Sequence, residues 1–131
     1  MELCGEVTLS KYLKTFKNSR MEEKEALPIF LKVVEAVAYM HLKGFCHRDI
    51  KLTNVMIGKN GKPKIIDFGF ASTISKKKTQ YCGTPSYMAP EIVKRKGYYG
   101  DKVDVWALGV VYYKMLTGNY PFGSKKIKNY F

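Results

Sequence analysis

The feature of this sequence that most constrains its fold is a long apolar run at helical spacing that ends in a dense polar cluster. Between about Glu22 and Lys43 apolar side chains recur every three or four positions, which predicts an amphipathic helix with one buried face. Gly44 is expected to end that helix. The stretch HRDIKLTN, residues 47–54, follows at once. Polar groups concentrated beside a core segment predict a functional loop.

The start of this helix has two candidate caps. Ser19 with Glu22 fits a capping box, whereas Glu22 can itself open the helix. Pro28 lies inside the run and is expected to kink the helix or to move its start downstream. Upstream, Thr8–Phe16 has the pattern of a short helix, and residues 18–20 that of a break.

A small β-hairpin is expected in the middle of the chain. Val55–Ile57 and Lys64–Ile66 are short β-type runs, and the Asn60-Gly61 pair between them is a strong hairpin signal. The hairpin is the only sheet that the pattern predicts.

The second half of the chain predicts a long loop and two more helices. Residues 69–86 are rich in Gly, Ser, Thr and Lys, which favours a loop of a length that is often functional. A short helix is expected at Pro90–Lys94, and a strongly apolar one at Asp101–Leu116 that Gly118 closes. The expected fold class is therefore α+β, mainly α.

Composition restricts the class of protein and its surroundings. The chain has 131 residues and carries 23 Lys and Arg against 11 Asp and Glu, a net charge of +12. Such charge suits anionic partners, although a solvated lysine-rich surface is the simpler explanation. The three cysteines, Cys4, Cys46 and Cys82, have no metal-binding or disulfide spacing. With no signal peptide and no membrane-length apolar stretch, the pattern predicts an intracellular, cytoplasmic protein without membrane contact.

The polar loop contains the groups that phosphoryl transfer needs. Asp49 can accept a proton from a hydroxyl nucleophile, and the amide oxygen of Asn54 can bind Mg²⁺. Lys51, between them, can neutralise a transferring phosphoryl group. An aspartate in a polar loop is more often a turn or cap residue, so this pattern alone is weak.

Two further motifs strengthen the functional interpretation of the polar loop. Asp67-Phe68-Gly69 follows the hairpin, and a segment that ends in Ala89-Pro90-Glu91 comes after it. The order H-R-D-x-x-x-x-N, D-F-G, A-P-E, followed by DVWALGV at 104–110, resembles that of the eukaryotic protein kinases, serine/threonine type. The resemblance implies part of a kinase domain over residues 1–131, mainly the large C-terminal lobe. Its parts would be a hinge at 1–7, a catalytic loop at 47–54 and an activation segment at 67–91.

The resemblance also implies roles for individual residues. Asp49, Lys51 and Thr84 would be catalytic. Asp49 would orient the acceptor hydroxyl, and Thr84 would bond to both Asp49 and Lys51. ATP and Mg²⁺ would be the cofactors, and a protein with Ser or Thr the substrate. Phe68 and His47 would stack, and Asp104 would hold the backbone of the catalytic loop. The implied cofactor-binding residues are Glu2, Cys4, Lys51, Asn54, Met56 and Asp67, of which Asn54 and Asp67 would bind the metal.

Regulation and specificity depart from the usual pattern. Gln80 stands where related kinases often carry a phosphorylated threonine, which leaves Thr79 as the candidate site and Arg48 as the residue that would pair with its phosphate. Ser72, Thr73 and Ser75 are the alternatives. Thr53 stands where kinases that select basic substrates often have Glu, so a non-basic or acidic preference is expected.

Parts of the family's domain have no counterpart in these residues. The small N-terminal lobe and the last C-terminal helices are absent, so little catalysis is expected from this chain alone. Glu91 would lack the downstream arginine with which it pairs in the family. A non-catalytic interaction module, docking a partner through the apolar helix at 103–116, is the alternative reading. A nucleic-acid binder is disfavoured, because no binding motif accompanies the lysine clusters.

Overall fold

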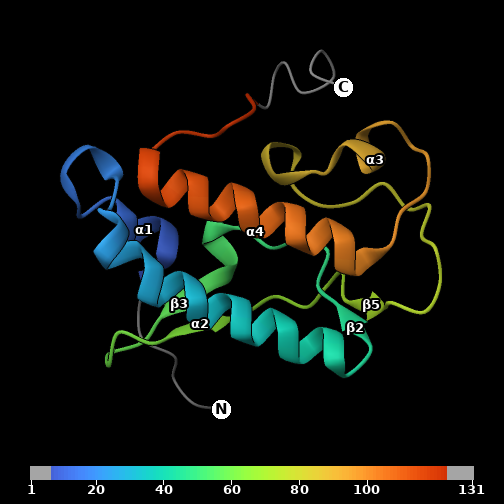
Figure 1. Ribbon diagram of the computed structural model, residues 1–131, viewed down its shortest axis with the longest axis horizontal. Coiled ribbons are helices and arrows are strands. Elements are labelled where there is room, and N and C mark those ends of the chain that lie inside the picture. Colours follow the sequence, from blue (N-terminus) through green and yellow to red (C-terminus); the bar gives the residue numbers. More distant parts are fainter. Residues whose placement is uncertain (1–6, 124–131) are drawn as a thin grey trace.

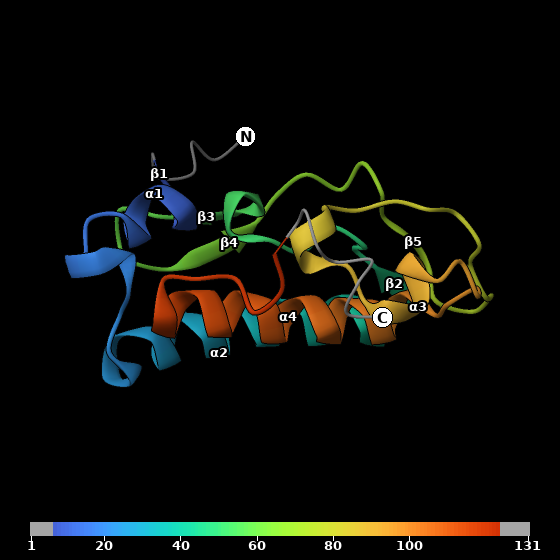
Figure 2. The same cartoon turned by 90° about the horizontal axis from the view of Figure 1, so that it is seen from above.

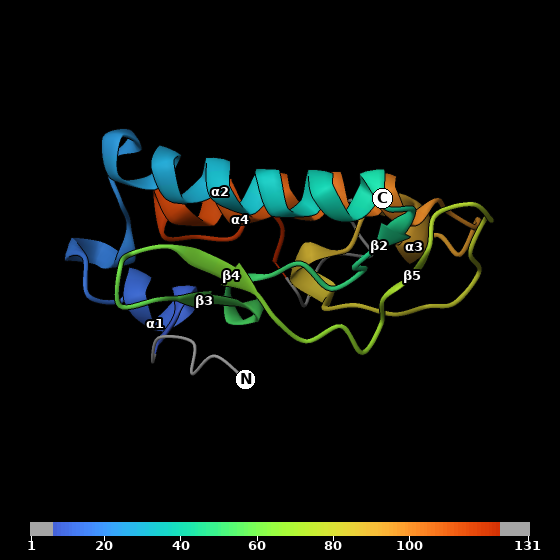
Figure 3. The same cartoon turned by 90° about the horizontal axis from the view of Figure 1, so that it is seen from below.

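The computed structural model describes residues 7–123, which form two layers. Helices α2, Glu23–Leu42, and α4, Gly100–Thr117, run antiparallel side by side and make one layer (Figure 1). The strands make the other layer, together with the loop at 47–54 and the segment at 67–91, as the edge-on views show (Figures 2 and 3). We keep for these two the names that the resemblance suggests, the catalytic loop and the activation segment. The α+β, mainly α, fold class is confirmed. Within the described residues no helix combines the length and the apolar character needed to cross a membrane.

Helix α2 begins where the second of the two expected caps lies. Glu22 is its N-cap, and its backbone N–H donates to Glu25 Oε2 at 3.0 Å. Ser19 instead sits in a short 3₁₀ turn, Lys17–Ser19, with a φ of 52°, so the Ser19–Glu22 capping box is not formed. Pro28 lies within the helix, which still begins upstream of it at Glu23, so the start is not displaced.

Helix α4 ends as expected at Gly118, which adopts the left-handed conformation with a φ of 76°. Its inward face packs on α2, where the rings of Phe30 and Tyr112 stack with centroids 4.4 Å apart. One stripe of α4 remains exposed, with Val105 59% and Tyr113 45% accessible. The apolar surface that the sequence predicts on this helix is therefore narrow, and a partner for it remains a prediction. The buried residues of α4 are Gly100, Val103, Asp104, Ala107, Leu108, Val110, Val111 and Met115.

The predicted hairpin is confirmed, with a third strand added. Strands β3, Val55–Ile57, and β4, Pro63–Ile65, pair antiparallel, and Gly61 takes a positive φ of 74° in the connection. Strand β1, Val7–Thr8, pairs with β3 on its other edge, giving the order β1-β3-β4. The remaining helices are α1, Leu9–Leu13, which Thr8 caps, and α3, Pro90–Val93.

The expected loop at 69–86 is partly ordered by pairing. Strand β5, Ser72–Thr73, pairs antiparallel with β2, Phe45–Cys46, just before the polar loop. A 3₁₀ turn, Pro85–Tyr87, follows nearer the end. The sequence predicted a long loop and did not identify this strand, because a two-residue strand has no periodicity that a sequence pattern can show. The pairing ties the activation segment to the start of the catalytic loop.

Two glycines of α4 should respond oppositely to alanine. A Cβ at Gly100 would lie 2.8 Å from Cys46 Cβ, whereas one at Gly109 would meet nothing within 4 Å. Gly109→Ala should raise the free energy of unfolding by about 0.5–1 kcal/mol, because alanine loses less backbone entropy in a helix. Gly100→Ala should lower it, because α4 must move away from β2. Urea denaturation of both variants checks this, and equal effects would contradict the close packing at Gly100.

Candidate active site

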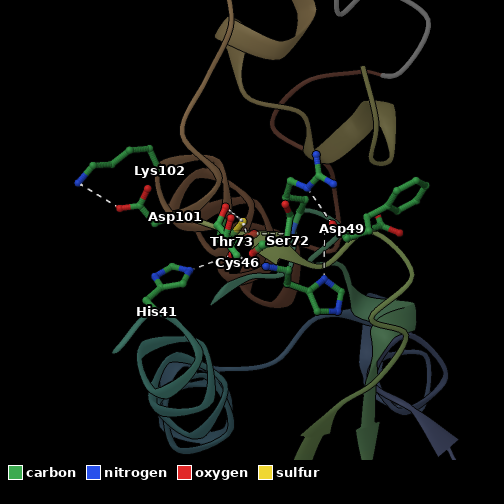
Figure 4. Close-up of polar contacts among 11 residues, drawn as sticks. His41, Cys46, Asp49, Ser72, Thr73, Asp101 and Lys102 are labelled. Carbon is green, nitrogen blue, oxygen red and sulfur yellow. Dashed lines mark hydrogen bonds and ion pairs between the residues drawn. The ribbon is translucent and has the colours of Figure 1, made fainter. Parts of the chain in front are cut away.

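The catalytic loop is fastened to α4 through one buried carboxylate. Asp104, 1% exposed, accepts hydrogen bonds from the backbone N–H of His47 and of Arg48, each at 2.8 Å. His41, near the end of α2, reaches the same carboxylate with Nε2 at 2.8 Å from Oδ2 (Figure 4). Arg48 has a φ of 68°, a conformation that L-residues rarely adopt. The carboxylate therefore holds the chain in an unfavourable backbone conformation just before Asp49.

His47 connects the catalytic loop to the segment after β4. Its Nδ1 accepts the N–H of Asp49 at 3.1 Å, so its Nε2 carries the proton that it donates to Ile66 O at 3.0 Å. The edge of its ring also meets the ring of Phe68, with centroids 5.2 Å apart. The expected contact between His47 and Phe68 is thus present in the structure.

Asp49, Lys51 and Thr84 meet in a triangle of polar contacts. Thr84 Oγ1 donates to Asp49 Oδ1 at 2.9 Å and accepts from Lys51 Nζ at 2.8 Å. Lys51 Nζ lies 3.4 Å from Asp49 Oδ2 as an ion pair. Asp49 is 8% exposed, so its charge is compensated by close partners. The three side chains come from two segments more than thirty positions apart.

Asn54, which ends the 3₁₀ turn Leu52–Asn54, closes the loop from the other side. Its amide Nδ2 donates to Asp49 O at 2.9 Å and to Asp49 Oδ2 at 3.3 Å. Since the amide group is used in this way, its Oδ1 is left as an acceptor. Asn54 O in turn accepts the N–H of Ile66 at 2.9 Å. Because Ile66 directly precedes Asp67, this bond holds the loop next to Asp67.

Asp67 lies exposed, with a φ of 59°, and its Oδ1 accepts the N–H of Gly69 at 3.2 Å. No group of three or more His, Cys, Asp or Glu side chains that could enclose a metal occurs in residues 7–123. Asp67 and Asn54 offer one carboxylate and one amide oxygen, a donor set that fits Mg²⁺ when phosphates and water complete its octahedron.

The other residues singled out in the sequence lie in different settings. Met56 is half-buried in β3 opposite Thr8 of β1. Glu91 is half-buried and has no ion pair within the part of the chain that the structure describes. Thr79 is exposed, and among the described residues no hydrogen bond joins it to Arg48. Glu2 and Cys4 lie outside the described residues.

Tyr98 is a central residue of the site that the sequence patterns did not identify. Its hydroxyl donates to Gln80 O at 2.7 Å and accepts from Arg48 Nη1 at 3.2 Å. Arg48 Nε also donates to Phe70 O at 2.7 Å, so this side chain joins three segments. Burial raises the pKa of Tyr98 to about 12, and a contact with the Cys82 thiol adds to the effect. No local signal could have found Tyr98, because its partners lie 16 to 50 positions away.

The family of this chain follows from comparison with known proteins. The protein kinase domain family matches residues 1–131. Sperm motility kinase 3A of Mus musculus is 42% identical over 130 residues, which are 98% of this chain and 25% of that protein. CBL-interacting protein kinase 25 of Oryza sativa subsp. japonica is 44% identical over 112 residues, 82% of this chain and 22% of that protein.

A third relative is the serine/threonine-protein kinase kin-29 of Caenorhabditis briggsae, 39% identical over 130 residues, 98% of this chain and 16% of that protein. The chain belongs to the protein kinase domain family. It spans about a quarter or less of the length of these relatives. Kinases of this family in general use ATP and Mg²⁺.

Deprotonation of Tyr98 should destabilise the fold at high pH. Its folded-state pKa of about 12 lies above the ordinary value of 10, so the folded protein binds more protons than the unfolded chain between these values. The contribution of Tyr98 to stability is therefore complete below pH 10 and is lost as the pH rises towards 12. Urea denaturation from pH 9 to 11.5 should show a steeper loss for the native protein than for Tyr98→Phe. Parallel curves would contradict the assignment.

Proposed function

We propose that this protein is an ATP-dependent serine/threonine protein kinase, which transfers the γ-phosphoryl group of MgATP to a Ser or Thr hydroxyl of a protein substrate. The observation that supports this most is the triangle of Asp49, Lys51 and Thr84. It places a carboxylate and a cation from the loop at 47–54 next to a hydroxyl from a second, distant segment, and buried hydrogen bonds hold that loop in place. Phosphoryl transfer depends on such positioning and on charge neutralisation more than on covalent chemistry.

In this proposal Asp49 orients the acceptor. Its Oδ1 is bonded to Thr84 and its Oδ2 to Lys51 and Asn54, yet a carboxylate has about four acceptor sites, so capacity remains for the substrate hydroxyl. The acceptor oxygen forms a bond to the γ-phosphorus as the bond to the ADP oxygen breaks, and ADP leaves with that electron pair. Asp49 receives the hydroxyl proton and releases it to solvent.

Lys51 and Thr84 complete the acceptor side. Lys51 Nζ, which already bonds to both partners, supplies positive charge next to the transferring group. Thr84 fixes the separation of Asp49 from Lys51, since its single hydroxyl bonds to each of them. Asn54 and Asp67 would hold Mg²⁺, which neutralises phosphate charge when it is bound.

Serine and threonine are the proposed acceptors because of the lysine at position 51 and the threonine at position 84. Both correspond to the serine/threonine pattern of the family, and the structure brings the two side chains into direct contact. The relative from Caenorhabditis briggsae is named a serine/threonine-protein kinase. The cytoplasmic location expected from the sequence remains part of the proposal.

Removing the charge of Asp49 tests the proposal directly. Asp49→Asn keeps the shape of the side chain but removes the proton acceptor, so kcat should fall by roughly 10²- to 10⁴-fold. The measurement is transfer of labelled phosphate from MgATP to a Ser/Thr peptide library by the protein at its full natural length. An unchanged melting temperature would show that the variant is folded. Activity equal to that of the native protein would overturn the proposed function.

Thr84 offers a graded test of the triangle. Thr84→Ser keeps the hydroxyl and should retain most of the activity, whereas Thr84→Val keeps the shape but breaks both bonds. Two lost charge-assisted hydrogen bonds, each contributing about 1.5–3 kcal/mol, should lower kcat/KM by at least roughly tenfold. The measurement is kcat/KM of both variants on one peptide. Equal values for the two variants would show that Thr84 does not position Asp49 and Lys51.

A further inference from the structure

Two lysine-rich segments, distant in the sequence, come together at one end of the molecule. The activation segment contains Lys76, Lys77 and Lys78, and the turn after α3 contains Lys94, Arg95 and Lys96. All are exposed except Lys78, which is half-buried. In Figure 1 the two segments run together at the end of the molecule that carries β5 and α3, opposite α1. We call these six residues the basic surface.

Backbone pairing and close packing hold the basic surface together. Lys78 N–H donates to Tyr98 O at 2.7 Å, and Tyr98 N–H donates back to Lys78 O at 2.9 Å. Gly97 approaches so closely that a Cβ there would lie 2.9 Å from Lys77 Cε. Arg95 lies over the ring of Tyr81, with Cζ 4.5 Å from its centroid. The two cationic segments are thus fixed side by side.

The basic surface has no internal counterion. Among the described residues no carboxylate forms an ion pair with any of its six cations. The nearest acidic residues in the sequence are Glu91 and Asp101, and Asp101 instead pairs with Lys102 at 3.7 Å (Figure 4). Six like charges held together repel one another, and this repulsion is relieved when an anionic partner binds. The surface therefore favours an anionic partner.

The basic surface is continuous with the proposed active site. Lys78 stands six positions before Thr84, and an extended chain of six residues spans at most roughly 20 Å. Tyr98 gives a second connection, because its backbone bonds Lys78 while its hydroxyl bonds Arg48, next to Asp49. A substrate chain whose hydroxyl lies at Asp49 can therefore reach the surface with residues about five to seven positions away.

We propose that the basic surface binds an acidic segment of the protein substrate and thereby makes the enzyme prefer acceptor sites with a cluster of Asp or Glu about five to seven residues away. This inference rests on the proposed function and deepens it, and it agrees with Thr53 standing where basic-directed kinases often have Glu. A peptide is favoured over a nucleic acid because the surface lies within reach of the proposed acceptor site, where the protein substrate would be bound.

The test uses two matched triple variants of the full-length protein. Lys77→Ser, Lys94→Ser and Lys96→Ser together remove three charges from the basic surface. Lys11→Ser, Lys14→Ser and Lys17→Ser remove three exposed charges around α1, at the opposite end of the molecule. The two proteins carry the same net charge, so any difference between them reports the place of the charges. Neither set includes a residue of the proposed active site.

The substrates are three Ser-centred peptides of equal length. Two carry four Glu residues, beginning five positions before or five positions after the Ser, and the third has Gln at those positions. Native protein should prefer a Glu peptide over the Gln peptide. Loss of three exposed ion pairs, each contributing roughly 1.5- to 5-fold, should reduce that preference about threefold to a hundredfold in the basic-surface variant only. The preference should also decline with rising salt.

A binding measurement separates this inference from the proposed function. Fluorescence anisotropy of labelled Glu and Gln peptides on Asp49→Asn protein, with and without the basic-surface substitutions, reports recognition without turnover. Transfer with equal kcat/KM for Glu and Gln peptides would overturn the inference and leave the proposed function intact. Selective binding of the Glu peptide, combined with no transfer by the native protein, would overturn the proposed function and support the inference about the basic surface. Equal loss in both triple variants, or tighter binding of an RNA or DNA oligonucleotide than of the Glu peptide, would also overturn the inference.

Discussion

The hydrogen bonds between the Asp104 carboxylate and the backbone of the catalytic loop are the interaction on which the rest of the site depends. Burying an unpaired charge costs several kcal/mol, so a carboxylate that is 1% exposed must be well bonded. Two backbone N–H groups and the ring of His41 provide those bonds. In return, the carboxylate stabilises a φ of 68° at Arg48, a conformation that costs of order 1–3 kcal/mol for residues other than glycine. The left-handed residue turns the chain so that Asp49 follows it into the site.

A short series of hydrogen bonds connects the backbone that Asp104 holds to Asp49, the proposed catalytic residue. His47 joins the anchored backbone to Ile66, Ile66 joins Asn54, and Asn54 joins Asp49. Each of these bonds is accepted by a backbone oxygen, and the two side chains that donate, His47 and Asn54, are buried, which restricts their movement. The helix layer gives the rigid base, and the loops that lie on it carry the reactive groups, which is the usual division of work between scaffold and function. Thr84 then adds the activation segment to the same framework.

The sequence predicted the regular parts of the fold and most of the polar cluster, but not the tertiary pairings. The periodicity of α2 and α4 is local, and so is the turn signal of the hairpin, so both were found. The pairing of Cys46 with Ser72 was not, because it depends on where the helices place two short segments. Tyr98 was missed for the same reason. The motif residues were found because the chemistry requires particular residue types at particular spacings, and here the fold brings Asp49 and Thr84 within 2.9 Å.

If Thr79 is the regulatory site that the sequence predicts, Arg48 would connect it to the basic surface through Tyr98. Its guanidinium group is bonded to neutral acceptors, Phe70 O and the Tyr98 hydroxyl, and within residues 7–123 no carboxylate pairs with it. A phosphate on Thr79 would carry about −1.5 to −2 charges, and an ion pair between it and the guanidinium group would be stronger than the present bonds from that group to neutral acceptors. Arg48 would therefore exchange the Tyr98 hydroxyl for the phosphate. Because the backbone of Tyr98 also bonds Lys78, that exchange would act on the part of the chain that holds the basic surface together.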